Sequence, residues 1–503
     1  MPSTADLIFL ALLFALTVTP LSVRLLGDGG IGWHIRTGQQ ILQTHTIPHT
    51  DSFSSSMQGK PWFAWEWLYD VIVGQLDSIA GLNGVVWFTA VLIGAVFAWT
   101  FHLLVARGTN LLIALVLMLL AVSASMIHFL ARPHVLNWLF TLAWFWILDA
   151  TERRCFNRES GLRSRWLWAL PVLMLVWVNV HGGFLLGFAL LGIYWGGALW
   201  TWLTTNEYRI EDSLQKIVAA RRARSLIWVG LASVLASMVN PYGWKLHSHV
   251  YEYLSNRFLM DHIEEFQSPN FHGVAQRCFL LLLLITMGVL AARARELRVS
   301  QILTLLLAVY TGLYSARSLP VSSILLVIMV GPLLPELSAG FFHRMSTVDS
   351  QMRGHLWPVV AAVAMFFVAS NHGRVGANLW MDAHFGPGRM PVEAVSVLDQ
   401  QKIEGPVLTP DYWGGYLIYR LYPRTQVVVD DRHDFYGADF FKLYLRMMHV
   451  EFGWDEFLQR YKPAYVLVPR ESPLANMLMK TPGWKVIHLD ELSITFQRGL
   501  ARP

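Results

Sequence analysis

One short polar stretch decides how this chain is organised: Leu26-Gly27-Asp28-Gly29-Gly30-Ile31-Gly32-Trp33-His34-Ile35-Arg36. It follows directly after the first apolar segment of the chain. An acidic residue stands where a membrane helix is expected to end, and a Trp-His pair follows five and six residues later. A carboxylate at a membrane surface, close to aromatic and ionisable side chains, is unusual. This stretch is therefore the first candidate for a functional site.

The composition around this stretch is that of a membrane protein. Of 503 residues, 54% are hydrophobic and only 15% are charged, whereas soluble domains carry roughly 25% charged residues. The 22 tryptophans suit the aromatic belts found at membrane interfaces. The net charge of +5 is explained by the short loops described below. We therefore expect a membrane-lipid environment and no nucleic-acid partner.

Apolar runs of about spanning length recur along the chain. The first, 6–26, has no basic region ahead of it and no clear cleavage site after it, so we expect a retained helix rather than a signal peptide. With it, about eleven transmembrane helices are expected. The stretch 66–82 contains Glu66, Asp70 and Asp77 and is expected to be interfacial. The other runs are 84–106, 110–127, 134–150, 166–180, 184–204, 226–240, 277–292, 299–315, 319–337 and 355–370.

The short loops predict the orientation. Arginines and lysines crowd the loops at 153–165, 216–224, 293–298 and 344–353. With eleven spans, all four loops fall on one side, and the positive-inside rule makes that side cytoplasmic. The N-terminus is then cytoplasmic. The first loop, 27–83, and the tail lie on the extracytoplasmic side, so we expect a transmembrane domain at 1–370 and an extracytoplasmic domain at 371–503.

The tail has the pattern of a small soluble α/β domain. Short apolar runs that predict buried strands alternate with helical patterns, which is typical of a largely parallel sheet. The expected strands are 405–409, 426–430, 464–468 and 484–488, and the expected helices are 412–421, 436–449, 453–461 and 472–480. In the first loop, residues 31–43 have the spacing of an amphipathic helix.

The candidate catalytic groups lie in the first loop. Asp28 could act as a general base or orient an acceptor hydroxyl, or it could simply cap the following helix. His34 lies six residues on, so a helix that starts between the two could aim both side chains at one cleft. Asp51 and Glu66, in the same loop, could supply a second carboxylate.

Candidate binding groups lie at the outer ends of other segments. Arg132 and Arg317 are not needed for topology, and two guanidinium groups beside a lipid-accessible cleft suit a phosphate, although snorkelling to the interface is equally compatible with their positions. The other candidates share that face; they are His134, His181 and Asn240 at helix ends, and Asp431 and Arg432 in the polar run 430–434. A helix stop for Asn240 and a solvated loop for 430–434 remain alternatives.

Several motifs resemble those of the GT-C class of polytopic membrane glycosyltransferases, specifically bacterial members with a soluble C-terminal domain. The motifs are Asp28-Gly29-Gly30-Ile31-Gly32-Trp33-His34, Ile47-Pro48-His49-Thr50-Asp51-Ser52-Phe53, Trp65-Glu66-Trp67-Leu68, His181-Gly182-Gly183-Phe184, Asn240-Pro241-Tyr242-Gly243, Gly414-Gly415-Tyr416-Leu417 and Val429-Asp430-Asp431-Arg432.

The resemblance implies an enzyme of the bacterial inner membrane. Such enzymes transfer a hexose or pentose from a polyprenyl-phosphate donor to a glycan, lipid or protein acceptor, with inversion, and use an acidic residue of the first outer loop. Asp28 matches that position, but Gly29 and Gly30 stand where the class often has a second acid. Some members use a divalent metal; no ligand set is evident here, and no metal residues are assigned.

Two other functions remain open. A transporter or flippase of lipid-linked solutes would need ionisable residues at mid-bilayer, and these are scarce; paired broken helices of an inverted repeat are also not seen. A non-catalytic assembly protein of a polysaccharide system would keep the fold without the chemistry.

Overall fold

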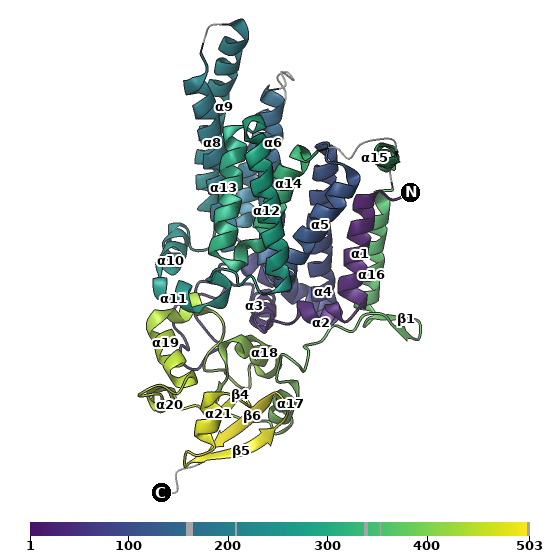
Figure 1. Cartoon of the computed structure of the whole chain (residues 1–503). Coiled ribbons are helices and arrows are strands. Elements are labelled where there is room, and N and C mark those ends of the chain that lie inside the picture. Colours follow the sequence, from purple (N-terminus) through teal and green to yellow (C-terminus); the bar gives the residue numbers. More distant parts are fainter. Residues whose placement is uncertain (157–163, 207–208, 336–340, 353, 500–503) are drawn as a thin grey trace.

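The computed structural model describes residues 1–156, 164–206, 209–335, 341–352 and 354–499. Long helices form an upright bundle, and the C-terminal part packs below one end of it (Figure 1). The helices of the bundle are α1 Thr4–Val18, α4 Trp67–Ala106, α5 Leu111–Ser125, α6 His134–Phe156, α7 Ala169–Trp177, α8 Leu185–Thr204, α9 Ile210–Ser237, α12 Val274–Arg293, α13 Val299–Tyr314, α14 Leu319–Val330 and α16 Leu356–Ser370.

Among the described residues, five helices are long and apolar enough to cross a membrane, which makes the chain a multi-pass membrane protein. They lie at Trp67–Ala106, Leu111–His128, Gly182–Thr204, Val274–Glu296 and Ala316–Leu333. Four shorter apolar helices, Thr4–Val18, Arg165–Trp177, Val299–Tyr314 and Leu356–Ser370, accompany them. The expected total of about eleven spans stays a prediction, because several helices are shorter than the roughly 20 residues that usually cross a bilayer.

Several expected segment boundaries differ from the structure. The loop expected at 216–224 is helical and belongs to α9, which begins at Ile210. The run 6–26 is broken, because Pro20 ends α1 and the chain restarts as the short α2, Leu21–Leu25. The stretch 66–82 is not separate from the next run. It is helical and continues into α4, with a kink at Gly81, whose φ of 59° is in the left-handed region.

The polar stretch after the first apolar segment forms the start of helix α3, Ile31–Thr44, and touches the C-terminal part of the chain. Gly32 packs against α18, Asp411–Leu421: a Cβ on Gly32 would lie 2.1 Å from the carbonyl oxygen of Gly415. A Cβ on Gly415 would in turn lie 2.3 Å from the carbonyl oxygen of Gly29. These glycines are therefore required for close backbone packing between α3 and α18.

The C-terminal part contains a four-stranded mixed sheet of strand order β3-β4-β6-β5. Only β3 and β4 are parallel; β6 pairs antiparallel with both β4 and β5. The expectation of a largely parallel sheet is wrong, because the sequence pattern missed β6 and the strand expected at 426–430 forms only isolated bridges. The strands are β3 Val407–Leu408, β4 Tyr465–Pro469, β5 Trp484–Leu489 and β6 Ser493–Arg498.

Helices surround this sheet and line the seam with the bundle (Figure 1). They are α17 Val392–Gln400, α18, α19 His433–Met448, α20 Asp455–Tyr461 and α21 Pro473–Leu478. The hairpin β1 Arg374–Val375 and β2 Asn378–Leu379 follows α16. Two further helices, α10 Trp244–Ser255 and α11 Arg257–His262, lie above α19 in this view, at the lower end of the bundle (Figure 1). Helix α15, Phe341–Gln351, lies at the opposite end.

The first loop is joined to the C-terminal part by backbone hydrogen bonds. Val427 donates to the carbonyl of Phe53 at 3.2 Å, and Ser55 donates to the carbonyl of Val427 at 2.8 Å. Ser54 and Val427 form a parallel bridge, and Val427 also bridges to Val407 of β3. A segment of the first loop therefore extends the edge of the C-terminal sheet.

Candidate active site

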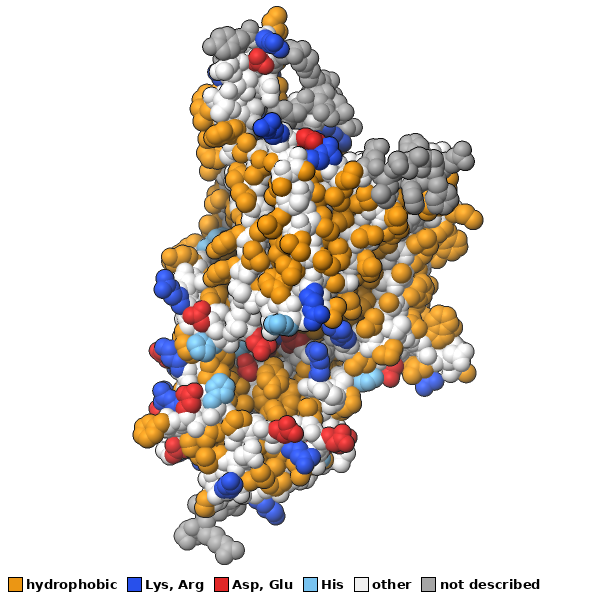
Figure 2. Space-filling view, in the orientation of Figure 1, with side chains coloured by type: hydrophobic (Ala, Val, Ile, Leu, Met, Phe, Trp, Pro, Cys, Tyr) orange, Lys and Arg blue, Asp and Glu red, His pale blue; other side chains and the backbone are white. Residues whose placement is uncertain are grey.

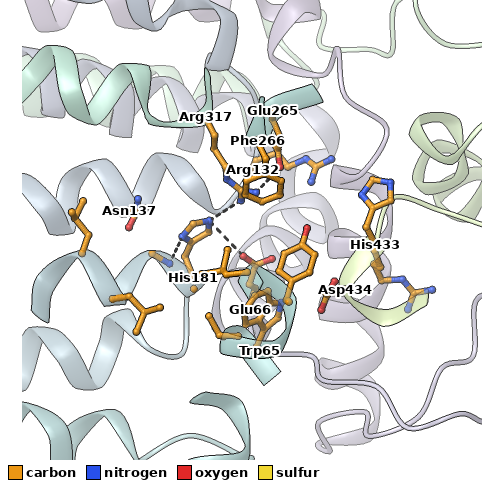
Figure 3. A pocket seen from close by; sticks show the side chains of 18 of the residues that line it. Trp65, Glu66, Arg132, Asn137, His181, Glu265, Phe266, Arg317, His433 and Asp434 are labelled. Carbon is orange, nitrogen blue, oxygen red and sulfur yellow. Dashed lines mark hydrogen bonds and ion pairs between the residues drawn. The ribbon is translucent and has the colours of Figure 1, made fainter. Parts of the chain in front are cut away.

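A cavity of about 460 Å³ lies where the bundle, the first loop and the C-terminal part meet. Figure 2 shows acidic, basic and histidine side chains gathered at this level, between an apolar band above and the C-terminal part below. Figure 3 shows the cavity from close by. Its polar and aromatic lining includes Trp33, Trp62, Trp65, Glu66, Asp70, Arg132, Asn137, His181, Tyr253, Glu265, Arg317, Asp431, Arg432, His433 and Asp434.

One side of the cavity is apolar and reaches into the bundle. This side is built by helices α8, α10, α13 and α14. The side chains are Leu185, Leu186, Ala189, Val250, Leu254, Leu307 and Val321. A single space thus joins a charged region at the membrane surface to a hydrophobic region between helices, as an amphiphilic ligand requires.

Glu66 is the predicted catalytic residue that lines the cavity. It stands at the start of α4 and its exposed fraction is 9%. One oxygen lies 3.9 Å from His34 Nε2 and the other lies 3.8 Å from His181 Nε2. Burial raises the pKa of Glu66 to about 8; Arg317 and Arg132 oppose the rise, and Asp434 and Glu265 add to it.

Arg317 lies beside Glu66 and has two polar partners. Its guanidinium donates to Glu265 at 2.5 Å and lies 3.1 Å from His181 Nε2 (Figure 3). Burial opposes ionisation of Glu265, but Arg317 holds the pKa of that carboxyl below its ordinary value. Burial, with Arg317 second, places the pKa of His181 well below its ordinary value. His181 is therefore neutral at the cavity wall.

Arg132 joins the first loop to the C-terminal part. Its guanidinium donates to Asp28 at 2.6 Å and to the carboxylate of Asp431. Asp431 also accepts the indole N–H of Trp33 at 2.9 Å. Burial, with the neighbouring carboxylates, raises the pKa of Asp431 to about 6 against the effect of Arg132. The second carboxylate near Asp28 is thus supplied by the C-terminal part rather than by positions 29 and 30.

Asp28 itself lies behind Arg132 and is not among the cavity-lining residues. One of its oxygens accepts the backbone N–H of Gly30 at 2.9 Å and the guanidinium of Arg132. The first of these contacts lies in the turn before α3 and does not cap that helix, whose N-cap is Gly30, so the capping role considered from the sequence is wrong. Through the second contact, Asp28 interacts with Arg132, which lines the cavity.

This donor set does not suit a metal ion. The two acidic residues that converge, Asp28 and Asp431, already share the guanidinium of Arg132, which occupies the position where a cation would balance them. Within the described ranges, metal-ligand geometry is found elsewhere, at Glu393, His488 and Asp490 in the C-terminal part. We therefore derive no step through a metal.

His34 lies behind Glu66 and is fully buried. Its Nδ1 is 2.6 Å from a carboxylate oxygen of Asp70, and its ring stacks on Trp33 with 3.6 Å between centroids. Burial lowers the pKa of His34 well below its ordinary value, with nearby Arg132 adding to the effect. His34 therefore meets the cavity only through Glu66 and Asp70.

Asp51 and Arg432 form a buried ion pair. Arg432 donates to both oxygens of Asp430, at 2.8 and 2.7 Å, and lies 2.8 Å from Asp51. Its guanidinium carbon also lies 4.6 Å from the ring centre of Trp62. Arg432 lines the cavity wall, but its charge is balanced by two carboxylates. This pair holds the first loop to the C-terminal part.

The remaining predicted residues lie outside the cavity lining. His134 lies 2.8 Å from the carbonyl oxygen of His128 through Nε2. Asn240 donates to the carbonyls of Ser237 and Gly243, which supports the helix-stop alternative. Among the residues that the structure describes, these two are therefore not cavity-lining groups.

Sequence reasoning did not select four acidic or histidine residues of the cavity lining, Asp70, Glu265, His433 and Asp434. His433 and Asp434 belong to the polar run 430–434, so the signal was present. His433 lies 2.6 Å from Asp411, and Asp434 lies 2.9 Å from His249 of α10. Glu265 comes from a short turn between α11 and α12 that carries no motif, and only the tertiary structure brings it to Arg317.

Comparison with known proteins identifies the fold. The structure resembles the archaeal oligosaccharyltransferase AglB from Archaeoglobus fulgidus, in complex with an inhibitory peptide and a dolichol-phosphate, with a TM-score of 0.58 and 9% identity over 93% of this chain and 68% of that chain. The apo oligosaccharyltransferase from the same organism gives a TM-score of 0.51 and 11% identity over 93% of this chain and 69% of that chain. No family model and no curated protein sequence matches the chain.

At these identities the likeness concerns the fold. The fold is that of the GT-C class of polytopic membrane glycosyltransferases, and the resemblance expected from the sequence is confirmed at this level. The site adds its own chemistry. It offers an unpaired carboxylate at the cavity, two neighbouring guanidinium groups, and an apolar region that continues into the bundle.

Proposed function

We propose that this protein is an inverting glycosyltransferase that takes a hexose or pentose from a polyprenyl-phosphate donor. The observation that supports it most is the form of the cavity, in which a charged region and an apolar region are continuous. The apolar side between α8, α10 and α13 would hold the first isoprene units of the lipid, and the charged side would hold the phosphate and the sugar.

Arg317 and Arg132 are the proposed phosphate-binding residues. The leaving group of the reaction is a lipid phosphate that is already anionic, so it needs charge stabilisation more than protonation. Arginine offers several donors to phosphate oxygens. Arg317 keeps an exposed fraction of 31% for its side chain, and its known partners leave part of its guanidinium facing the cavity.

Glu66 is the proposed general base, in place of Asp28. An acceptor hydroxyl must lose its proton as it attacks the anomeric carbon, and the base must be within hydrogen-bond reach of it. Glu66 lines the cavity, whereas Asp28 is held by Arg132 and lies outside the lining. The raised pKa of Glu66, about 8, suits a group that exchanges a proton near neutral pH.

The proposed working face is extracytoplasmic, in a bacterial inner membrane with the N-terminus in the cytoplasm. The segments 216–224, within α9, and 293–298, between α12 and α13, carry basic residues of the positive-inside pattern and lie toward the end of the bundle opposite the cavity (Figure 1). Arg158, Arg163 and Arg353, part of the same pattern, lie outside the described residues. The acceptor would be an envelope glycan, lipid or protein, and the extracytoplasmic domain would be 371–503.

The proposal is tested in two stages. First, cells with and without the protein are compared by mass spectrometry of envelope glycans and polyprenyl-phosphate sugars. Accumulation of one lipid-linked sugar on deletion identifies the donor, and identical glycan and lipid profiles count against transfer. Second, the purified protein in lipid nanodiscs is given that donor, and release of polyprenyl phosphate is measured. A transporter would move the donor without releasing the phosphate.

A further inference from the structure

A buried chain of three ionisable side chains runs from the core to the cavity. Asp70 Oδ1 lies 2.6 Å from His34 Nδ1, and His34 Nε2 lies 3.9 Å from Glu66 Oε2. Both His34 and Asp70 are fully buried, and Asp70 as well as Glu66 is among the residues that line the cavity. Within the described ranges, neither His34 Nε2 nor Asp70 Oδ2 has a hydrogen-bond partner. The imidazole therefore lies between two acids of the cavity wall.

The packing holds the imidazole in this orientation. Trp33 stacks on one face of the ring, and the ring of Tyr69 meets it edge-on, with 5.3 Å between centroids. Helix α3 is pressed against α4 at this point, where Gly38 approaches the carbonyl of Asp70. Because these two aromatic contacts restrict rotation of the imidazole ring, Nδ1 stays next to Asp70 and Nε2 stays next to Glu66. Protons can then move between the acids without movement of the ring.

We propose that Asp70, His34 and Glu66 form a proton wire that places one negative charge on either Glu66 or Asp70, and that this wire makes Glu66 available as a base. The inference rests on the proposed function of Glu66. In this arrangement His34 and Asp70 are positioning residues, because they act on the acceptor only through Glu66.

The number of protons on the three side chains is the same in both states of the wire. In one state, Asp70 is ionised, His34 carries its proton on Nδ1 and Glu66 is protonated. When Glu66 passes its proton to Nε2, Nδ1 passes its own to Asp70, and Glu66 becomes a carboxylate. His34 remains neutral in both states, in agreement with its lowered pKa. Glu66 then takes the proton of the acceptor hydroxyl as the oxygen–carbon bond forms and the bond from carbon to the phosphate oxygen breaks.

The gap of 3.9 Å between His34 Nε2 and Glu66 Oε2 is longer than a hydrogen bond. Hydrogen bonds of catalytic groups are often long without substrate and shorten in the complex. Glu66 also has other charged or titratable neighbours, from every element around it, and these affect its titration. They are His181 before α8, Arg132 before α6, Glu265 and Arg317 in the turns beside α12 and α14, and Asp434 in α19.

The test compares His34→Gln with the wild-type protein by infrared spectroscopy of the carboxyl band of Glu66. The band is assigned by its loss in Glu66→Gln, and its intensity is followed against pH in nanodiscs without substrate. A glutamine side chain can donate a hydrogen bond, but it cannot accept a proton from Glu66 and release another to Asp70. The midpoint of Glu66 is expected to rise by about one pH unit in His34→Gln.

A matched control and a second variant accompany this measurement. His247→Gln replaces a histidine that lies 3.0 Å from Ser237 Oγ and outside the cavity lining, and it is expected to leave the midpoint unchanged. His34→Asn retains an amide near the position of Nδ1 for Asp70 but offers nothing at Nε2. It is expected to shift the midpoint in the same direction, and it replaces His34→Gln if that variant does not fold.

Transfer assays provide the second readout. In His34→Gln the kcat at pH 7 is expected to fall about tenfold and to recover above about pH 9, with the donor KM unchanged. A rise of one unit from a pKa of about 8 lowers the ionised fraction of Glu66 at pH 7 about tenfold. A merely structural role would lower kcat equally at every pH. Equal infrared midpoints in the wild type and both His34 variants overturn the wire. A shifted midpoint without any transfer by the wild type supports the wire and overturns the proposed function.

Discussion

Two clusters of charged residues lie at opposite ends of the helical bundle. At the end away from the cavity, Asp149 of α6 is contacted by Arg107 at 2.9 Å, Arg153 at 2.8 Å and Arg298 at 3.3 Å. Glu152 is paired with Arg298 at 3.0 Å. Both carboxylates are buried, with exposed fractions of 0% and 2%.

The cavity cluster contains the same residue types in a different arrangement. Glu66 has two histidines within 3.9 Å and no guanidinium at ion-pair distance among its described neighbours. Arg317 and Arg132 have carboxylate partners but border a space of about 460 Å³. At the opposite end, three arginines surround Asp149, whose side chain is fully buried. The two clusters therefore differ in that Glu66 borders a cavity and has two histidines, not arginines, as its described neighbours at ion-pair distance.

The largest effect is expected from Glu66→Gln. Removing a general base typically costs about 10² to 10⁴ in rate, so release of polyprenyl phosphate in nanodiscs should fall within that range at pH 7. Folding should be retained, because the substitution removes a buried carboxyl without a cationic partner. The matched variant Glu152→Gln in the other cluster should lower thermal stability and keep turnover per folded molecule. Full activity in Glu66→Gln would exclude Glu66 as the base.

A nearly equal effect, on stability instead of rate, is expected from Asp149→Asn. Removing one partner of a buried ion pair costs about 3–5 kcal/mol, because the remaining charges stay buried without compensation. Thermal unfolding in detergent, followed by tryptophan fluorescence, should show a lower midpoint. Turnover of the molecules that remain folded should match the wild type. An unchanged midpoint together with lost turnover would show that the Asp149 cluster serves activity and not stability.

A smaller effect is expected from Arg317→Lys, which keeps the charge and loses the planar fork of donors. The KM for the lipid donor should rise about tenfold to a hundredfold, since hydrogen bonds to charged groups contribute about 1.5–3 kcal/mol. Steady-state kinetics across donor concentrations measure the change. Arg293→Lys is the control, because Arg293 is paired with Glu296 at 2.6 Å at the opposite end. A KM unchanged in both variants would remove Arg317 from the phosphate site.

The smallest effect concerns pH. Glu66 works as a base only when ionised, and burial raises its pKa to about 8, so kcat/KM should rise with pH and level off only above about pH 8. Below the midpoint the rate should fall up to about tenfold per pH unit, because the protonated form accumulates. A pH–rate profile in a buffer series of constant ionic strength tests this. A rate that falls as pH rises from 6 to 8 would contradict a carboxylate base.

Much of the fold could be predicted from periodicity and charge. Long apolar runs and basic loops indicate a membrane bundle with a soluble tail, since hydrophobicity and loop charge act locally along the chain. The break at Pro20 and the continuation of 66–82 into α4 were missed, because whether an amphipathic stretch joins its neighbour depends on packing. The sheet was predicted as largely parallel because the sequence pattern missed β6, which pairs antiparallel with both β4 and β5.

The sequence predicted many of the residues that make up the candidate site. It did not predict which of them performs which role. Glu66, His181, Arg132 and Arg317 were selected for their positions at one membrane face, and they line one cavity. Asp28 could not be distinguished from Glu66, because both are isolated acids of the first loop. The difference comes from Arg132, which holds Asp28 and joins it to Asp431, about 400 residues along the chain.

The polar stretch that begins at Leu26 separates what the sequence determines from what the tertiary structure determines. By itself, the sequence determined that an acid, glycines and a Trp-His pair would stand at the membrane surface, because local hydrophobicity sets where a helix can leave the bilayer. Only the tertiary structure decided their use: the glycines let α3 meet Gly415, Trp33 donates to Asp431, and His34 lies between Asp70 and Glu66. These contacts depend on the close packing of distant segments, which no local pattern records.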